Sequence, residues 1–145
     1  METFSRETFD PWWVTGFSDG EASFTYSRSS SQIAMYYAVK LTGSDRLILE
    51  RLQAFFGAGK IYQVKARSRP GTTKTASMFR VTRTEELKRV VDHFDRYPLQ
   101  SEKKVVYKLW KDMVELRRDH GGSRELLDDL AIELSAAVPR NQSWR

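Results

Sequence analysis

Two acidic residues, Asp19 and Glu21, flank Gly20 at the end of an apolar stretch and immediately before an alternating run of residues. Carboxylate oxygens are ligands that a hard divalent ion such as Mg²⁺ prefers, and a protein usually supplies one or two of them beside phosphate oxygens and water. Such an ion promotes phosphodiester hydrolysis because it activates a water molecule and neutralises charge on the leaving oxygen. One glutamate alone supplies too few ligands for such an ion. The competing interpretation of Glu21 is a surface acid that ends a helix.

A helix is predicted just before these acids, over residues 11–19, and it would deliver them to the place where a sheet begins. Asp10 can cap its first free N–H groups, and Pro11 suits the first helical position. Gly16 and Gly20 lie four residues apart, although glycine in a helix interior costs roughly 1 kcal/mol relative to alanine. Two glycines on one face allow a second helix to approach closely, which predicts packing on a partner. The bulky residues of this helix are interpreted as core residues: Trp12, Trp13 and Phe17.

Periodicity predicts an α+β domain around this helix. The expected strands are 23–27, 33–41, a stretch that begins at Lys60, and 76–82, and the expected further helices are 45–56, 84–96, 101–120 and 123–138. The order is αββαββα, with a four-stranded antiparallel sheet, helices on one face and extra C-terminal helices. We expect a single domain over residues 1–145, with a core at about 10–118 and a helical extension at 119–139.

Charge is unevenly distributed along the chain. The net charge is +5, and the segment from Lys60 to Thr84 contains seven basic residues and no Asp or Glu, whereas acids predominate after Lys111. A basic stripe confined to one part of a fold indicates a polyanionic partner. The alternative is a solvated positive face without a partner.

Composition excludes several classes. The chain has no cysteine, so it has neither disulfides nor a thiolate-based site. No apolar run approaches the ~20 residues that a membrane span needs. The first residues read neither as a signal peptide nor as a transit peptide. We therefore expect no membrane partner and no secretion, and the compartment is otherwise open.

Three motifs resemble those of the LAGLIDADG homing endonuclease family. Residues 15–24, T-G-F-S-D-G-E-A-S-F, are similar to the motif after which the family is named, with Ala22 where glycine is usual. Two further blocks match in the family's order: F-F-G-A-G-K-I at 55–61, and Y-P-L-Q-S-E-K-K at 97–104 followed by Tyr107 and Trp110. The resemblance covers about residues 10–115, and the three motifs together make it specific.

The resemblance implies roles for residues at the predicted helix end. Glu21 would bind Mg²⁺ together with the main-chain carbonyl of Gly20, and a dimer would hold two or three divalent ions. Asp19 would be structural, bonding backbone near the helix end. Lys103 would lie near the active site and offset developing negative charge, at a helix N-terminus that itself favours anions. The alternative for Lys103 is a solvated lysine at the start of a helix.

Two residues depart from the family's pattern. Glu102 stands where many relatives carry Lys or Gln, which leaves open whether Lys103 or Lys104 points inward. Gly43 lies where relatives often place a Gln that orients solvent, so either other groups organise the water or turnover is slow.

The sheet face away from the helices is the expected DNA-binding surface, because a two-stranded ribbon fits the major groove, where Arg and Lys read guanine. Some of its residues would only contact phosphates. The expected residues are Thr25, Ser27, Tyr36, Lys40, Tyr62, Lys65, Arg67, Arg69 and Arg80. The register around Lys65 is open, because Gln63 and Lys65 fall on the Ile61 face unless a bulge intervenes. The alternative is an ordinary polar sheet face.

The acidic motif occurs once, so two cuts require two chains, and twofold symmetry favours a near-palindromic target. Together with the single motif, the resemblance implies a homodimer with Gly16, Gly20 and Trp13 at its interface, which makes Mg²⁺-dependent double-strand breaks in long duplex DNA sites. Two alternatives remain: a maturase that binds intron RNA, and a regulator that binds DNA without cutting. The target and the host are not predicted.

Overall fold

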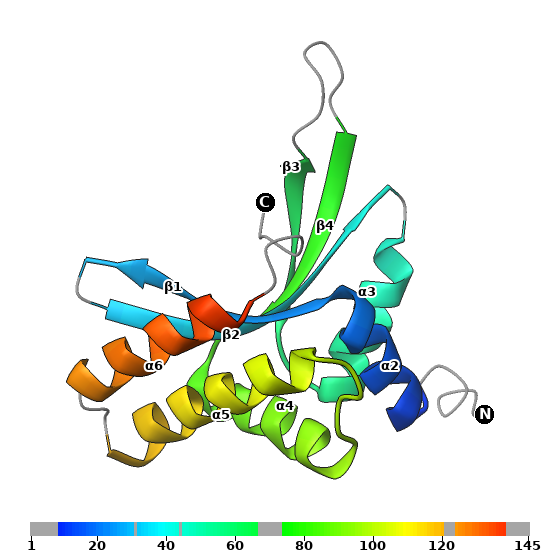
Figure 1. The fold of residues 1–145 in the computed structure, drawn as a ribbon. Helices are drawn as coiled ribbons and strands as arrows, with labels where there is room; N and C mark the ends of the chain where they lie inside the picture. The colour runs from blue at the N-terminus through cyan, green and yellow to red at the C-terminus, as the bar shows by residue number, and fades with distance from the viewer. Residues whose placement is uncertain (1–8, 31, 44, 67–73, 121–123, 139–145) are drawn as a thin grey trace.

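The structure is a computed structural model that describes residues 9–30, 32–43, 45–66, 74–120 and 124–138. Its elements, labelled as in Figure 1, follow the predicted order αββαββα with added C-terminal helices. The helices are α2 (Pro11–Glu21), α3 (Arg46–Phe56), α4 (Thr84–Arg96), α5 (Lys103–His120) and α6 (Arg124–Ala137). The strands are β1 (Ala22–Ser29), β2 (Gln32–Thr42), β3 (Lys60–Ala66) and β4 (Lys74–Val81).

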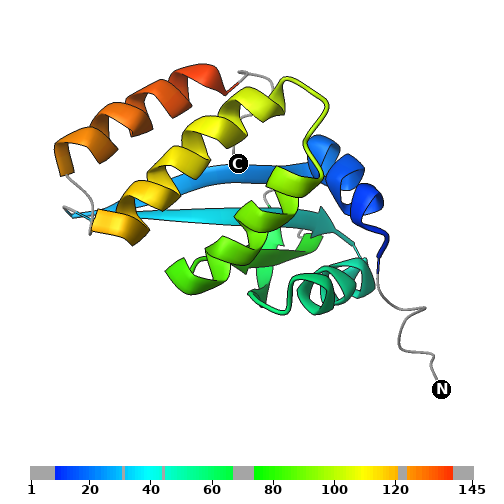
Figure 2. The same ribbon diagram turned by 90° about the horizontal axis from the view of Figure 1, so that it is seen from below.

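The four strands form one antiparallel sheet in the order β1-β2-β4-β3. The helices lie on one side of this twisted sheet, and none of the helices in the described residues lies on the other face (Figures 1 and 2). In the registers, Phe24 lies opposite Tyr37, and Val39 lies opposite Phe79. The predicted α+β architecture, with helices on one face, is therefore confirmed.

The core lies between the sheet and the helices, and Phe24 is at its centre. Its ring meets Tyr37 from β2, Phe94 from α4 and Trp110 from α5 at centroid distances of 5.2–5.4 Å. These rings are fully buried or nearly so, and burying a large apolar side chain stabilises a fold by roughly 1.5–3 kcal/mol. The indole N–H of Trp110 donates to the carbonyl of Thr25 at 2.9 Å, so α5 is attached directly to β1.

The expectation that Trp12 and Trp13 belong to the core is wrong. Their side chains are 52% and 41% exposed. The inward positions of α2 are instead Val14, Thr15 and Ser18, two of which carry hydroxyl groups. The helix also runs two residues further than predicted, to Glu21, because the N–H of Ala22 still donates to the carbonyl of Ser18.

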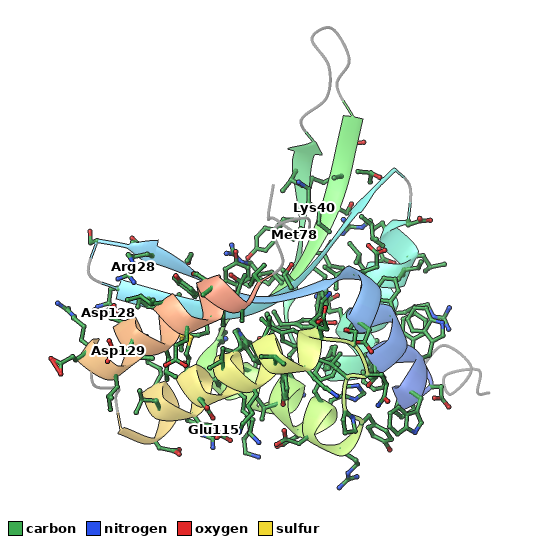
Figure 3. The ribbon with its side chains drawn as sticks, viewed as in Figure 1. Arg28, Lys40, Met78, Glu115, Asp128 and Asp129 are labelled. Carbon is green, nitrogen blue, oxygen red and sulfur yellow. The ribbon has the colours of Figure 1, made fainter. Side chains whose placement is uncertain are left out.

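Helix α6 packs along α5 and also reaches the β1–β2 hairpin. Arg28 donates to Asp128 at 3.1 Å (Figure 3). The hydroxyls of Tyr26 and Ser135 are 3.0 Å apart. Within the described ranges, no helix combines the length and the apolar composition that crossing a membrane would require.

Candidate active site and nucleic-acid interface

Glu21 is the last residue of α2, and its side chain is exposed where the helix passes into β1. None of the described residues forms a hydrogen bond or an ion pair with its carboxylate. The last carbonyl groups of a helix lack partners within the helix. The uncommitted carboxylate of Glu21 therefore belongs to the same helix end as the main-chain carbonyl of Gly20.

The oxygen atoms at this helix end supply part of the ligand set that a hard divalent ion needs. The Glu21 carboxylate and the Gly20 carbonyl are donors of the kind that Mg²⁺ prefers. The described residues contain no group of three or more His, Cys, Asp or Glu placed to hold a metal ion. One copy of the domain thus supplies the start of a ligand set, which phosphate oxygens, water or a second copy would have to complete.

Asp19 faces the loop that leads into α5. Its Oδ2 accepts the main-chain N–H of Gln100 at 2.9 Å. Its Oδ1 accepts the main-chain N–H of Ser101 at 3.1 Å and the Ser101 hydroxyl at 2.6 Å. The carboxylate of Asp19 is thus committed to protein donors that tie the last turn of α2 to the start of α5, in contrast to that of Glu21.

Lys103 points inward and is only 8% exposed, whereas Lys104 is exposed. The ammonium group of Lys103 donates to the carbonyl of Ala22 at 2.6 Å and to that of Ser18 at 3.1 Å. Burial lowers the pKa of Lys103, while the nearby carboxylates of Asp19 and Glu21 act in the opposite direction. The structure therefore brings a buried cation to the same helix end as the two acids.

The outward face of α2 carries Gly16 and Gly20. A Cβ atom built at either glycine would meet nothing within 4 Å, so packing inside this chain does not require them. Beside them Trp13, which is exposed, stacks on the buried Phe9 at 3.9 Å and on Phe17 at 4.9 Å; Phe17 is half-buried and packs against the core, as expected. This face, defined by Gly16, Gly20, Trp13 and Phe17, is the outer face of α2.

The inward side of α2 is held by hydrogen bonds. The Thr15 hydroxyl donates to the Tyr97 carbonyl at 2.7 Å, so it accepts from Nε2 of His93 at 3.1 Å. The hydroxyls of Ser18 and Tyr37 are 2.8 Å apart. Burial lowers the pKa of His93 to about 4, so its imidazole is neutral at pH 7.

The sheet face without helices, here called the open face, carries side chains from all four strands. Ser23, Ala38, Arg80 and Lys60 occupy one row across it, and Lys40, Met78 and Tyr62 occupy the next (Figure 3 labels Lys40 and Met78). The four strands contain no Asp or Glu. The open face is therefore positively charged without compensating acids on its own strands.

The structure places only some of the expected DNA-binding residues on the open face with accessible side chains. Ser27, Tyr36, Lys40, Tyr62 and Arg80 lie on the open face with exposed or half-buried side chains. Thr25 lies on this face too, paired with Tyr36, but is only 7% exposed. Lys65 pairs with Thr75 in an uninterrupted register, so no bulge intervenes, and its position in β3 alternates with Ile61 and not with Tyr62; the expectation that it belongs to the open face is wrong. Its side chain, and Arg67 and Arg69, lie outside the described residues.

The sequence analysis did not predict the full role of two residues at these sites. Lys60 is exposed and lies beside Arg80 in the β3–β4 register, which its alternation with Tyr62 could have indicated. Ser101 accepts the N–H of Lys103 at 3.1 Å, as a residue that caps the predicted helix 101–120 should, but its hydroxyl also donates to Asp19, a link between two helices that no local pattern reveals. Gly43 has φ 82°, a conformation that side chains other than glycine rarely adopt, so a Gln at this place would be strained.

Comparison with known proteins identifies relatives. The model for the LAGLIDADG endonuclease family matches residues 14–114. An uncharacterized 50.9 kDa protein in ND4 intron 1 of Podospora anserina is 31% identical over 123 residues, which cover 79% of this chain and 26% of that protein. Probable intron-encoded endonuclease 2 of Neurospora crassa is 28% identical over 128 residues, which cover 88% of this chain and 27% of that protein. The chain thus spans about a quarter of the length of these relatives.

Among solved structures, the I-SmaMI LAGLIDADG homing endonuclease bound to cleaved DNA is similar, with a TM-score of 0.73 and 28% identity. The similarity covers 94% of this chain and 46% of that chain, so the present domain corresponds to about half of it. The family match extends over most of the chain and includes the helix that carries Asp19 and Glu21. The chain belongs to the LAGLIDADG endonuclease family.

Proposed function

We propose that this domain is a site-specific homing endonuclease that acts as a homodimer and makes Mg²⁺-dependent double-strand breaks in long, near-palindromic duplex DNA. One observation carries the proposal: the exposed, uncommitted carboxylate of Glu21 and the buried ammonium of Lys103 meet at the end of a helix on whose outer face the described residues leave Gly16 and Gly20 exposed. A second copy packed on that outer face would bring a second Glu21 to the first.

The relatives support this proposal. The Neurospora crassa relative is described as a probable intron-encoded endonuclease, and I-SmaMI is a homing endonuclease seen on cleaved DNA. Because this domain corresponds to about half of the I-SmaMI chain, two copies would reproduce an assembly of that size. A twofold assembly presents the same surface twice, which favours a target with matching half-sites.

Each site residue has a separate task. Glu21, with the Gly20 carbonyl, would hold Mg²⁺, which when bound activates water and neutralises charge on the leaving oxygen. The Lys103 ammonium has three N–H donors and gives two to main-chain carbonyls, so one remains for a phosphate oxygen or a water molecule. Asp19 fixes the start of α5 and therefore the place of Lys103 relative to Glu21.

The open face would hold the duplex. Strands fit the major groove, and the exposed cations Lys60 and Arg80 lie on strands without acids. The row that contains Arg80 starts at Ser23, two residues after Glu21, so binding through this face places DNA beside the proposed active site.

Glu21→Gln tests the proposal. Gln keeps the shape of the side chain but loses the charge that would hold Mg²⁺, so the variant should fold, bind DNA and leave both strands uncut. Supercoiled plasmids that carry randomised or intron-flanking sites are incubated with Mg²⁺, with Ca²⁺ as the binding-only control. Linear product from pure Glu21→Gln protein would assign the catalytic acid elsewhere, and Asp19 would be tested next.

The same plasmids separate the alternatives. Wild-type protein that binds a site tightly in Mg²⁺ and never cuts it would be a regulator rather than a nuclease. Tighter, more salt-sensitive binding to intron RNA than to duplex DNA would indicate a maturase.

A further inference from the structure

Arg80 occupies the middle of the open face. It belongs to β4, a central strand of the sheet, and lies between Ala38 of β2 and Lys60 of β3 in the registers. Ala38 is small and only 6% exposed, so longer side chains around it cover this part of the sheet. A ligand bound to the open face would reach Arg80 with the groups that project furthest toward the sheet.

The guanidinium group of Arg80 is held in place by stacking. Its Cζ lies 3.6 Å from the centroid of the Tyr36 ring. Stacking uses the flat face of the guanidinium and leaves the N–H donors in its plane available. Nε is buried without a hydrogen-bond partner, and none of the described residues accepts a hydrogen bond from the two Nη groups. Arg80 is therefore oriented by an aromatic ring while its terminal donors are uncommitted.

The surroundings favour a ligand that accepts hydrogen bonds and is negatively charged overall. Lys60 lies directly beside Arg80, and like charges at opposed positions of a sheet repel each other. The four strands offer no carboxylate to relieve this repulsion. Two acceptors side by side in one plane match the end of a guanidinium, and in the major groove guanine presents such a pair as O6 and N7.

We propose that Arg80, oriented by Tyr36, reads a guanine in each half of the DNA target through its two Nη groups. This inference rests on the proposed function, because it assumes that the open face binds duplex DNA. The row of Arg80 meets β1 at Ser23, whereas Ser27 lies four residues further toward the hairpin end. The guanine therefore lies nearer to the cleaved phosphates than the bases that face Ser27.

Selection from a randomised duplex library in Ca²⁺, followed by sequencing of the bound DNA, tests this inference. Wild-type protein should prefer one guanine per half-site. Arg80→Ala should lose that preference by roughly tenfold or more and leave the other positions unchanged. Arg80→Lys keeps the charge and can still donate to guanine, but it lacks the planar pair of donors, so it should retain a weaker preference than wild type. Tyr36→Phe keeps the stacked ring and should retain it, and Tyr36→Leu should weaken it severalfold.

Lys60→Ala is the matched control, because Lys60 is the neighbouring cation in the same row. It should weaken binding to all sequences alike and lower the slope of log affinity against log salt by about one. If Arg80→Ala behaved like Lys60→Ala, Arg80 would contact a phosphate and the inference would be overturned. An unchanged base profile in Arg80→Ala, whatever its affinity, would also overturn the inference, with DNA binding by the domain left standing. If wild-type protein selected no duplex sequence, the proposed function would fall together with the inference.

Discussion

The hydroxyl of Ser101 lies 2.6 Å from Oδ1 of Asp19, and its oxygen also accepts the main-chain N–H of Lys103 at 3.1 Å. One hydroxyl therefore joins the acid near the end of α2 to the first residue of α5. The position of Lys103 depends on this contact because Lys103 is the residue that reaches back to the carbonyls of Ser18 and Ala22.

Ser101→Ala should lower the free energy of unfolding by about 1 kcal/mol, the usual cost of removing a capping hydroxyl. Ser101→Thr keeps the hydroxyl and should be close to wild type. Urea denaturation of both variants measures the difference. Equal stability of Ser101→Ala and wild type would show that the hydroxyl contributes nothing to the junction of the two helices.

Lys103→Met should abolish most cleavage, by roughly a hundredfold, because it removes a preorganised positive charge from the site. The fold should survive, because Met has a similar length and the buried ammonium is costly to desolvate. Lys104→Met is the matched control, since Lys104 is exposed one residue away, and it should cleave normally. Single-turnover cleavage at saturating protein compares the variants. Comparable losses in both variants would argue against a particular role for Lys103.

Gly20→Leu should prevent dimerisation without unfolding the domain. A Cβ at Gly20 meets nothing within the chain, so only a partner helix would clash with the new side chain. Sedimentation velocity at micromolar concentration should give a dimer for wild type and a monomer for the variant, with unchanged circular dichroism. A wild-type monomer under these conditions, with or without DNA, would contradict the homodimer.

Acidification should destabilise the domain through His93. Burial lowers its pKa to about 4 in the folded state, whereas an unfolded histidine has a pKa of about 6.5. The unfolded chain therefore binds the proton first, and stability present above pH 6.5 is lost as the pH falls toward 4. We expect a loss of roughly 3 kcal/mol across this window from this residue.

His93→Gln isolates that contribution. The Gln amide can still donate to the Thr15 hydroxyl but does not titrate. Urea unfolding at a series of pH values should show a shallower pH dependence for the variant than for wild type. Parallel curves would mean that the titration of His93 does not contribute to acid destabilisation.

The element order could be predicted from sequence because strands and helices here follow clear periodicities. Phe24, Met35, Tyr37 and Val39 alternate toward the core as expected, and the residue before Pro98 ends a helix region as proline requires. The helix end with Asp19 and Glu21 was recognisable because its motif is local in sequence.

What could not be predicted depends on contacts between distant segments. Trp12 and Trp13 were expected inside because they are large and apolar, but buried positions went to Thr15 and Ser18, whose hydroxyls find partners in Tyr97 and Tyr37. The choice between Lys103 and Lys104 depended on where α5 starts relative to α2, which is set by the Asp19–Ser101 contact.

The hydroxyl-lined inner side of α2 has a consequence for precision. A helix that packs only through apolar contacts can rotate about its axis at little cost in free energy, because apolar contacts are not directional. Hydrogen bonds are directional, and those of Thr15 and Ser18 fix the rotation of α2 from within its own domain. The direction in which the Glu21 side chain projects from the helix axis is thus fixed within one domain, before a partner binds. Two such helices packed across a twofold axis would bring their Glu21 carboxylates together without either helix having to rotate.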